Sequence, residues 1–144
     1  EVAYEVFTLH EPNIGRTLGR IGELPETMDF ESFREHLQES LPYANLRFGG
    51  LKKDSIKTVA LCSGGGAEFI KNAAKADAYV TGDVKYHDAQ LAKELGLLVV
   101  DAGHFGTEEI VADGIRDYLR DQSDKGRWGI EVQSFENQAD FFFE

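Results

Sequence analysis

Side chains of the types that bind divalent cations follow two neighbouring apolar stretches of the chain. The five that we single out are Asp83, His87, Asp101, His104 and Glu108. Imidazole nitrogens and carboxylate oxygens suit a divalent cation such as zinc, iron or manganese. His104 and Glu108 are four residues apart, close enough to share one ion or to bind adjacent ions, and Asp83 and His87 have the same spacing.

Each of these residues also has a purely structural interpretation. Glu108 could stabilise a helix N-terminus, Asp83 could cap the helix that follows it, and either histidine could be a core or surface residue. Two ligands would also be too few for a closed metal site, which usually has three or four. His10 and His36 lie outside these loops, and we interpret them as structural or surface residues.

Three successive strand, loop and helix units are expected to position the five side chains. The predicted strands are 57–62, 78–81 and 97–100, and the predicted helices run from about 67 to 75, 87 to 95 and 107 to 120. This order predicts an α/β fold, a layered sandwich with a mostly parallel sheet flanked by helices. The loops after the strands then meet at one sheet edge, where ligands bind in open α/β sheets.

Several further structural features are predicted from local patterns. Alternating residues predict strands at 2–9 and 129–135, and a glycine cluster at 15–22 predicts an irregular crossing. Asp29 is expected to cap a helix that ends at about Ser40. Thr107 is expected to cap the last helix, whose inward-facing residues would be Ile110, Val111, Ile115 and Leu119.

Composition excludes several classes of function. Asp and Glu outnumber Lys and Arg 26 to 15, for a formal charge of −11, so nucleic acid is not expected as a ligand. No apolar run approaches the roughly 20 residues that span a bilayer, so no membrane role is expected. The single cysteine, Cys62, excludes an internal disulfide framework and favours a reducing, cytoplasmic setting.

The glycine-rich segment 63–66 has two interpretations. It follows a predicted strand and precedes a helix, so its N–H groups could bind an anion. It lacks the Lys-Ser/Thr ending of a P-loop, and a tight strand-to-helix turn explains it equally well. Cys62 is interpreted as a small buried residue rather than as a nucleophile.

Two motifs resemble the Nif-three-like family, whose bacterial members are named GTP cyclohydrolase 1 type 2 homologues. They are TGDVKYHDA at 81–89 and DAGHFGTE at 101–108, with CSGGGAEFI upstream at 62–70. The likeness also reaches 17–24, similar to the segment where members with an inserted middle domain re-enter the main fold. It therefore covers about residues 14–144, and the tail at 137–141 departs from it because it lacks the family's proline.

The resemblance implies a two-metal site in a cleft between two similar α/β halves, within a ring-shaped hexamer. His104 and Glu108 correspond to the two metal ligands of the C-terminal half. Asp83 and His87 correspond to polar residues that line the cleft. The remaining ligands, two histidines and an aspartate, belong to the N-terminal half of the family's fold, and nothing in this chain matches them.

The same resemblance predicts the domain organisation. Residues 1–13 would end an inserted domain, and 14–144 would form the C-terminal α/β domain, one half of a pseudo-duplicated fold. The chain begins at Glu1 within an alternating pattern, so we expect a fragment. Such a fragment alone is expected to bind metal weakly and to be inactive if catalysis needs both ions.

The leading functional hypothesis is a fragment of a dinuclear metal-dependent hydrolase of the GTP cyclohydrolase type. Its two metal ions would activate a water and polarise a small-molecule or nucleotide substrate, with Asp83 or His87 placed to move a proton. Two alternatives remain open. One is a metal-binding oligomeric scaffold or regulatory protein without turnover, and the other is an α/β module that binds an anion at 63–66.

Overall fold

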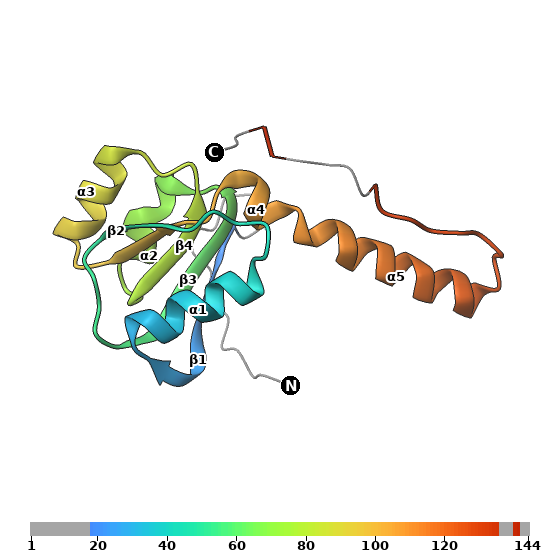
Figure 1. Cartoon of the computed structure of the whole chain (residues 1–144), viewed down its shortest axis with the longest axis horizontal. Helices are drawn as coiled ribbons and strands as arrows, with labels where there is room; N and C mark the ends of the chain where they lie inside the picture. The colour runs from blue at the N-terminus through green and yellow to red at the C-terminus, as the bar shows by residue number, and fades with distance from the viewer. Residues whose placement is uncertain (1–17, 136–139, 142–144) are drawn as a thin grey trace.

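The computed structural model describes residues 18–135 and 140–141, and these form a five-stranded sheet with helices on both faces (Figure 1). The spatial order of the strands is β1-β3-β4-β5-β2. The strands are β1 (Arg20–Met28), β2 (Arg47–Gly50), β3 (Ile56–Gly65), β4 (Ala78–Gly82) and β5 (Leu98–Asp101). The helices are α1 (Phe30–Ser40), the 3-10 turn η1 (Ala67–Phe69), α2 (Ile70–Ala73), α3 (Tyr86–Glu94), α4 (His104–Glu108) and α5 (Ile110–Gly126).

The centre of the sheet is parallel, as the sequence predicts. β4 pairs in parallel with both β3 and β5, and each edge strand is antiparallel to its neighbour. The three predicted central strands are therefore confirmed, although β3 continues through Gly65 into the segment expected to be a turn. The sheet is mixed because of β1 and β2, two edge strands that the sequence analysis does not predict.

Alternation along the central strands separates two apolar cores. Val80 and Val100 pack with Phe33 and Leu37 of α1 on one face of the sheet. On the other face, Tyr79 and Val99 belong to the cluster that includes Ile70 of α2 and Ala92 of α3. The predicted layered α/β arrangement, a sheet flanked by helices, is confirmed, because side chains of successive strand residues point to opposite faces and pack against helices there.

Two helix predictions are confirmed at their termini. The Asp29 carboxylate caps α1 by accepting a hydrogen bond from the Ser32 N–H at 2.8 Å, the usual N-cap arrangement. α3 ends at Glu94, and Gly96 follows with a φ of 71°, a left-handed conformation that glycine adopts without strain. The helix expected at 67–75 is shorter, because it consists of η1 followed by α2.

Helices α4 and α5 differ from two predictions. α4 begins at His104, with Gly103 as its N-cap, so Thr107 lies inside the helix and does not cap it. The apolar residues of α5 do not face inward: Ile110, Val111, Ile115 and Leu119 are 41%, 58%, 53% and 40% exposed. Figure 1 shows the reason, because α5 extends as an arm away from the sheet.

The segment after α5 is not the predicted edge strand. Residues 128–135 form neither helix nor strand, and they run back beside α5 (Figure 1). The Arg120 guanidinium donates a hydrogen bond to the Val132 carbonyl at 2.9 Å, which attaches this segment to the helix and not to the sheet. The strand predicted at 2–9 lies outside the described residues. No helix in the described ranges is long and apolar enough to cross a membrane.

Candidate functional site

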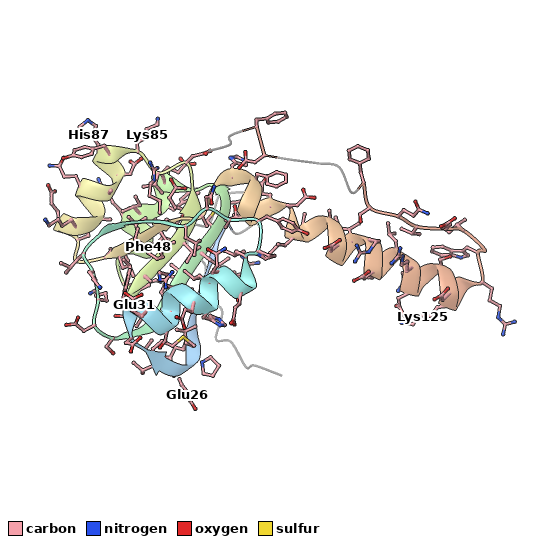
Figure 2. All side chains as sticks on the ribbon, in the orientation of Figure 1. Glu26, Glu31, Phe48, Lys85, His87 and Lys125 are labelled. Atoms are coloured by element: carbon pink, nitrogen blue, oxygen red, sulfur yellow. The ribbon has the colours of Figure 1, made fainter. Side chains whose placement is uncertain are left out.

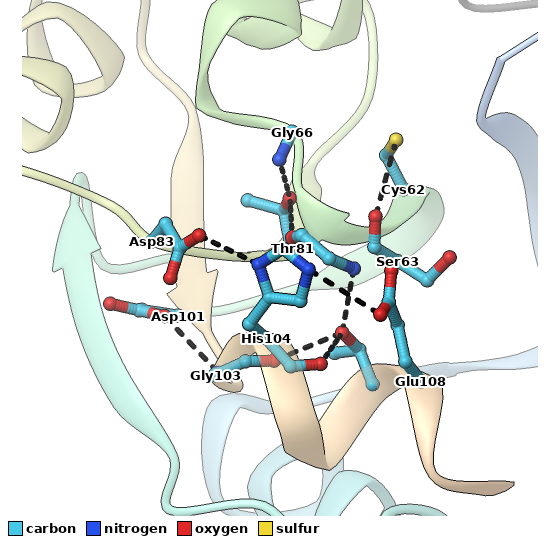
Figure 3. Close-up of polar contacts among 11 residues, drawn as sticks. Cys62, Ser63, Gly66, Thr81, Asp83, Asp101, Gly103, His104 and Glu108 are labelled. Carbon is cyan, nitrogen blue, oxygen red and sulfur yellow. Dashed lines mark hydrogen bonds and ion pairs between the residues drawn. The ribbon is translucent and has the colours of Figure 1, made fainter. Parts of the chain in front are cut away.

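His104 lies between two carboxylates at the C-terminal edge of the parallel strands (Figure 3). Its Nδ1 is 2.8 Å from Oδ2 of Asp83, and its Nε2 is 3.4 Å from Oε2 of Glu108. All three side chains are about half exposed, at 54%, 58% and 52% for His104, Asp83 and Glu108. The structure therefore brings together three of the five residues that the sequence singles out.

The start of α4 sets the direction of the imidazole. Gly103, with a φ of 75°, turns the chain from β5 into α4, and His104 is the first helical residue. A Cβ on Gly82, at the end of β4, would lie 2.7 Å from the His104 nitrogen and from the Gly103 carbonyl carbon. Only a residue without a side chain permits this approach, and it brings Asp83 within reach of His104.

Gly64 forms the floor beneath His104 and Glu108. It lies near the end of β3, and its N–H donates to the Thr107 hydroxyl at 2.8 Å. A Cβ at this position would be 2.4 Å from Oε1 of Glu108 and 3.1 Å from Nε2 of His104. The side chains of His104 and Glu108 thus converge over a space that any residue larger than glycine would fill.

The charges around His104 favour its cationic form. The hydrogen bond to Asp83 raises the pKa of His104 above its usual value, and the negative charge of Glu108 acts in the same direction. Burial opposes these effects, but little of the ring is covered. Two carboxylates facing one imidazole form an environment that attracts a cation, whether a proton or a metal ion.

Asp101 and His87 are not part of this cluster. The Asp101 carboxylate accepts a hydrogen bond from the Gly103 N–H at 3.1 Å and forms an ion pair with Arg47 at 2.6 Å. It therefore joins β5 to β2 and to the turn before α4. His87 lies on α3, where its ring has an edge contact with Tyr86. Figure 2 shows it on the outer side of that helix, away from α4.

The glycine-rich segment 63–66 uses two of its N–H groups within the fold. The Gly64 N–H donates to the Thr107 hydroxyl, and the Gly66 N–H donates to the Thr81 hydroxyl at 3.0 Å. These groups are not directed toward an external anion, so the structural interpretation of the turn is favoured. Burial raises the pKa of the Cys62 thiol, which makes this side chain a poor nucleophile.

A large apolar pocket lies beside the His104 cluster but does not include it. It measures about 410 Å³ and is bounded by β1, α1 and β3. Ser63 and Thr107 line its end nearest the cluster, and most of the remaining lining is aliphatic or aromatic. The pocket lining is therefore mainly apolar, whereas the His104 cluster consists of charged side chains.

Sequence reasoning did not identify Gly64 and Thr107 as parts of this site. The sequence places Gly64 only in a possible anion turn and Thr107 only as a helix cap, although DAGHFGTE contains the latter. Within residues 18–135 and 140–141, no group of three or more His, Cys, Asp or Glu side chains is arranged to hold a metal ion. His104 and Glu108 are the pair that could contribute to one.

Known relatives match the chain over most of its length. The GTP cyclohydrolase 1 type 2 homolog of Bacillus subtilis (strain 168) is 33% identical over 134 residues, which are 92% of this chain and 36% of the relative. The homolog of Listeria innocua is 34% identical over 125 residues, 85% of this chain and 33% of the relative. The chain thus spans about a third of the length of these relatives.

Solved structures share the fold. A Bacillus cereus protein related to NIF3 superposes with a TM-score of 0.80 at 35% identity, covering 90% of this chain and 36% of that protein. Staphylococcus aureus protein SA1388 gives a TM-score of 0.79 at 29% identity, covering 89% of this chain and 42% of that protein. The family described as Duf34/NIF3 (NGG1p interacting factor 3) matches residues 3–140. This chain belongs to the Duf34/NIF3 family.

Proposed function

We propose that this chain supplies His104 and Glu108 to the divalent-metal site of a dinuclear, metal-dependent hydrolase. The observation that supports the proposal is the convergence of Nε2 of His104 and Oε2 of Glu108, 3.4 Å apart, above Gly64. A nitrogen and a carboxylate oxygen at this separation fit zinc, iron or manganese, whose ligands they commonly are. The name of the relatives suggests GTP as the substrate and a cyclohydrolase reaction.

Further ligands would have to complete the site. Catalytic zinc usually has three protein ligands and a water, and this chain offers two among its described residues. The proposal therefore includes ligands from a second α/β half, in a pseudo-duplicated fold with two ions per complete site. We expect residues 1–13 to belong to an inserted domain, and the 144-residue chain alone to bind metal weakly.

A bound divalent ion would supply an activated water and polarise the substrate. In this chain, His104 and Glu108 would hold the ion, and the exposed half of each side chain leaves room for a substrate beside it. Asp83 and His87 remain predicted proton carriers. For Asp83, proximity to His104 supports a place in the site, whereas the position of His87 on α3 requires a substrate that extends toward that helix.

The first test is metal binding by the 144-residue chain. We expect titration with zinc or manganese to give an affinity that falls at least about tenfold in His104→Ala and in Glu108→Gln, because each removes one of two ligands. His36→Ala is the matched control, since it removes an exposed histidine from α1. Equal affinity in the His104→Ala variant and the unsubstituted protein would refute the site. If the affinity falls as expected, the next experiment is to test whether GTP consumption depends on His104 and Glu108.

The exposed apolar residues of α5 support self-association, which we propose leads to a homohexamer. Val111, Ile115 and Leu119 recur at helical spacing and are 40% to 58% exposed in the monomer. Exposed stripes of this kind usually mark a surface that another protein covers. This observation also supports the alternative of a metal-binding scaffold without turnover. In either case we propose a cytoplasmic protein, on the basis of the single cysteine.

Ile115→Lys tests this surface. We expect the variant to remain folded, with a stability change within about 0.5 kcal/mol, because Ile115 is half exposed and belongs to neither of the two core clusters. Sedimentation velocity should show a smaller assembly than for the unsubstituted protein. Asp124→Lys is the control, since it lies nine residues further along α5, on the opposite side of the helix. Assemblies of unchanged size in Ile115→Lys would exclude this stripe from the interface.

A further inference from the structure

The geometry points to Asp83 as a positioning residue that fixes the tautomer and orientation of His104. In this role, Asp83 accepts the Nδ1 proton, so the lone pair on Nε2 faces Glu108 and the space above Gly64. The value of that orientation rests on the proposed metal site. The hydrogen bond that produces it belongs to the protein alone and can be tested without metal.

The two contacts of the imidazole are unequal. The 2.8 Å separation between Nδ1 and Asp83 is that of a hydrogen bond, whereas the 3.4 Å separation between Nε2 and Glu108 is longer than a typical one. A neutral imidazole carries one N–H, and this N–H forms its stronger hydrogen bond at the shorter contact, from Nδ1 to Asp83. Nε2 and the Glu108 carboxylate then face each other as two acceptors, an arrangement that a cation between them would satisfy.

The backbone conformation of Asp83 and the glycine beside it allow its carboxylate to reach His104. Asp83 has a φ of 57°, a left-handed conformation that non-glycine residues seldom adopt, and Arg127 is the other such residue in the described ranges. A Cβ on Gly65 would lie 2.9 Å from the same Asp83 oxygen that meets His104. Asp is one of the few non-glycine residues that adopt this conformation readily. The chain therefore holds Asp83 in an uncommon conformation and leaves space on β3 for its carboxylate.

A carboxylate on the distal nitrogen of a histidine ligand is a general device of metal sites. It selects the tautomer, fixes the ring plane and makes the ligating nitrogen more basic. Asp83 reaches His104 from the loop after β4, whereas Glu108 reaches it from α4. The two carboxylates thus have different tasks: Glu108 lies on the side where an ion would bind, and Asp83 lies on the opposite side of the ring.

Asp83→Gly separates this role from a contribution to folding. Glycine accepts a φ of 57° without strain, so the variant loses the carboxylate and keeps the backbone. Nitrogen-15 NMR of the metal-free 144-residue chain, at a pH where His104 is neutral, reports which ring nitrogen carries the proton. We expect the Nδ1–H form in the unsubstituted protein and a shift toward Nε2–H in Asp83→Gly. Asp83→Asn should be intermediate, because its amide oxygen can still accept the Nδ1 proton.

Arg127→Gly is the matched control, since it relieves the same backbone conformation far from His104 and should leave the tautomer unchanged. Zinc titration is the second readout, with affinity expected to fall about 10- to 100-fold in Asp83→Gly. An unchanged Nδ1–H tautomer in Asp83→Gly would overturn the inference. If Asp83→Gly shifts the proton from Nδ1 to Nε2 but the unsubstituted protein binds no zinc, the positioning role would be supported and the proposed metal site refuted.

Discussion

Gly64→Ala is expected to weaken metal binding about 10- to 100-fold while destabilising the fold only modestly. The new Cβ would lie 2.4 Å from Oε1 of Glu108, an atom at the far end of a flexible side chain. Glu108 can rotate away at little conformational cost, but it would then no longer converge with His104. Loss of ligand geometry has effects of this size on metal affinity. Zinc titration measures the affinity, and thermal unfolding measures the stability.

Gly96→Ala is the control for backbone strain. Gly96 has a φ of 71°, close to the 64° of Gly64, and a Cβ there meets no atom within 4 Å. Both alanines should lower the free energy of unfolding by about 1–2 kcal/mol, because both force an L-residue into the left-handed region. Only Gly64→Ala should lose metal affinity. Equal affinities in the two variants would show that His104 and Glu108 do not bind an ion together above Gly64.

The centre of the fold could be predicted because its signals are local. β3, β4 and β5 each contain a short apolar run, with glycine or Asp at or just after the end of the strand and a helix beyond it. β1 and β2 carry weaker signals, since one contains Gly22 and Pro25 and the other ends in two glycines. Their strand conformation comes from pairing with β3 and β5, which is a tertiary effect that no local pattern encodes.

The candidate site was predictable in its residue types and only partly in its contacts. The four-residue spacing predicts that His104 and Glu108 lie close together across a loop-to-helix junction, and the strand order brings Asp83 to the same edge. The start of the helix at His104 itself was not predicted. The contact with Nδ1 depends on the left-handed backbone of Asp83, which its residue type permits but does not require. Asp101 forms an ion pair with Arg47 of β2, a strand that was not predicted from the sequence.

The outward face of α5 could not be inferred because an apolar stripe does not specify its partner. Ile110, Val111, Ile115 and Leu119 have the spacing of a core-facing helix, and a domain core is the usual explanation. In the single chain these residues are exposed, so their spacing does not say which surface, if any, covers them. This is also why the stripe supports self-association only as a proposal.

Asp77→Ala is expected to produce the largest loss of stability, about 3 kcal/mol. One oxygen of Asp77, immediately before β4, accepts three hydrogen bonds: from the Lys57 and Thr58 N–H groups and from the Thr58 hydroxyl, at 3.0, 2.8 and 2.8 Å. Alanine would leave these donors without that acceptor, and each such loss costs about 1–3 kcal/mol when the group is shielded from water. Urea unfolding at neutral pH measures the change.

Because of the position of Asp77, Asp77→Ala tests whether the stability of the fold can change without a change in metal affinity. It lies at the edge of the sheet opposite to the His104 cluster, since it precedes β4 and the cluster follows β4 and β5. Metal affinity should therefore be unchanged in Asp77→Ala at temperatures where the protein is folded. A lowered affinity would mean that packing of the central strands also controls the site.

Acid should remove the contribution of Asp77 in a defined pH window. Burial raises the pKa of Asp77, but the hydrogen bonds from Thr58 and Lys57 outweigh it, and the net pKa lies below the ordinary value of 3.8. The contribution is therefore complete above the unfolded pKa and is lost as the pH falls from about 5 through 3.8 and the folded pKa. The stability difference between the unsubstituted protein and Asp77→Asn should shrink over that range. A stability difference that stays constant for Asp77→Asn over that range would refute a lowered pKa.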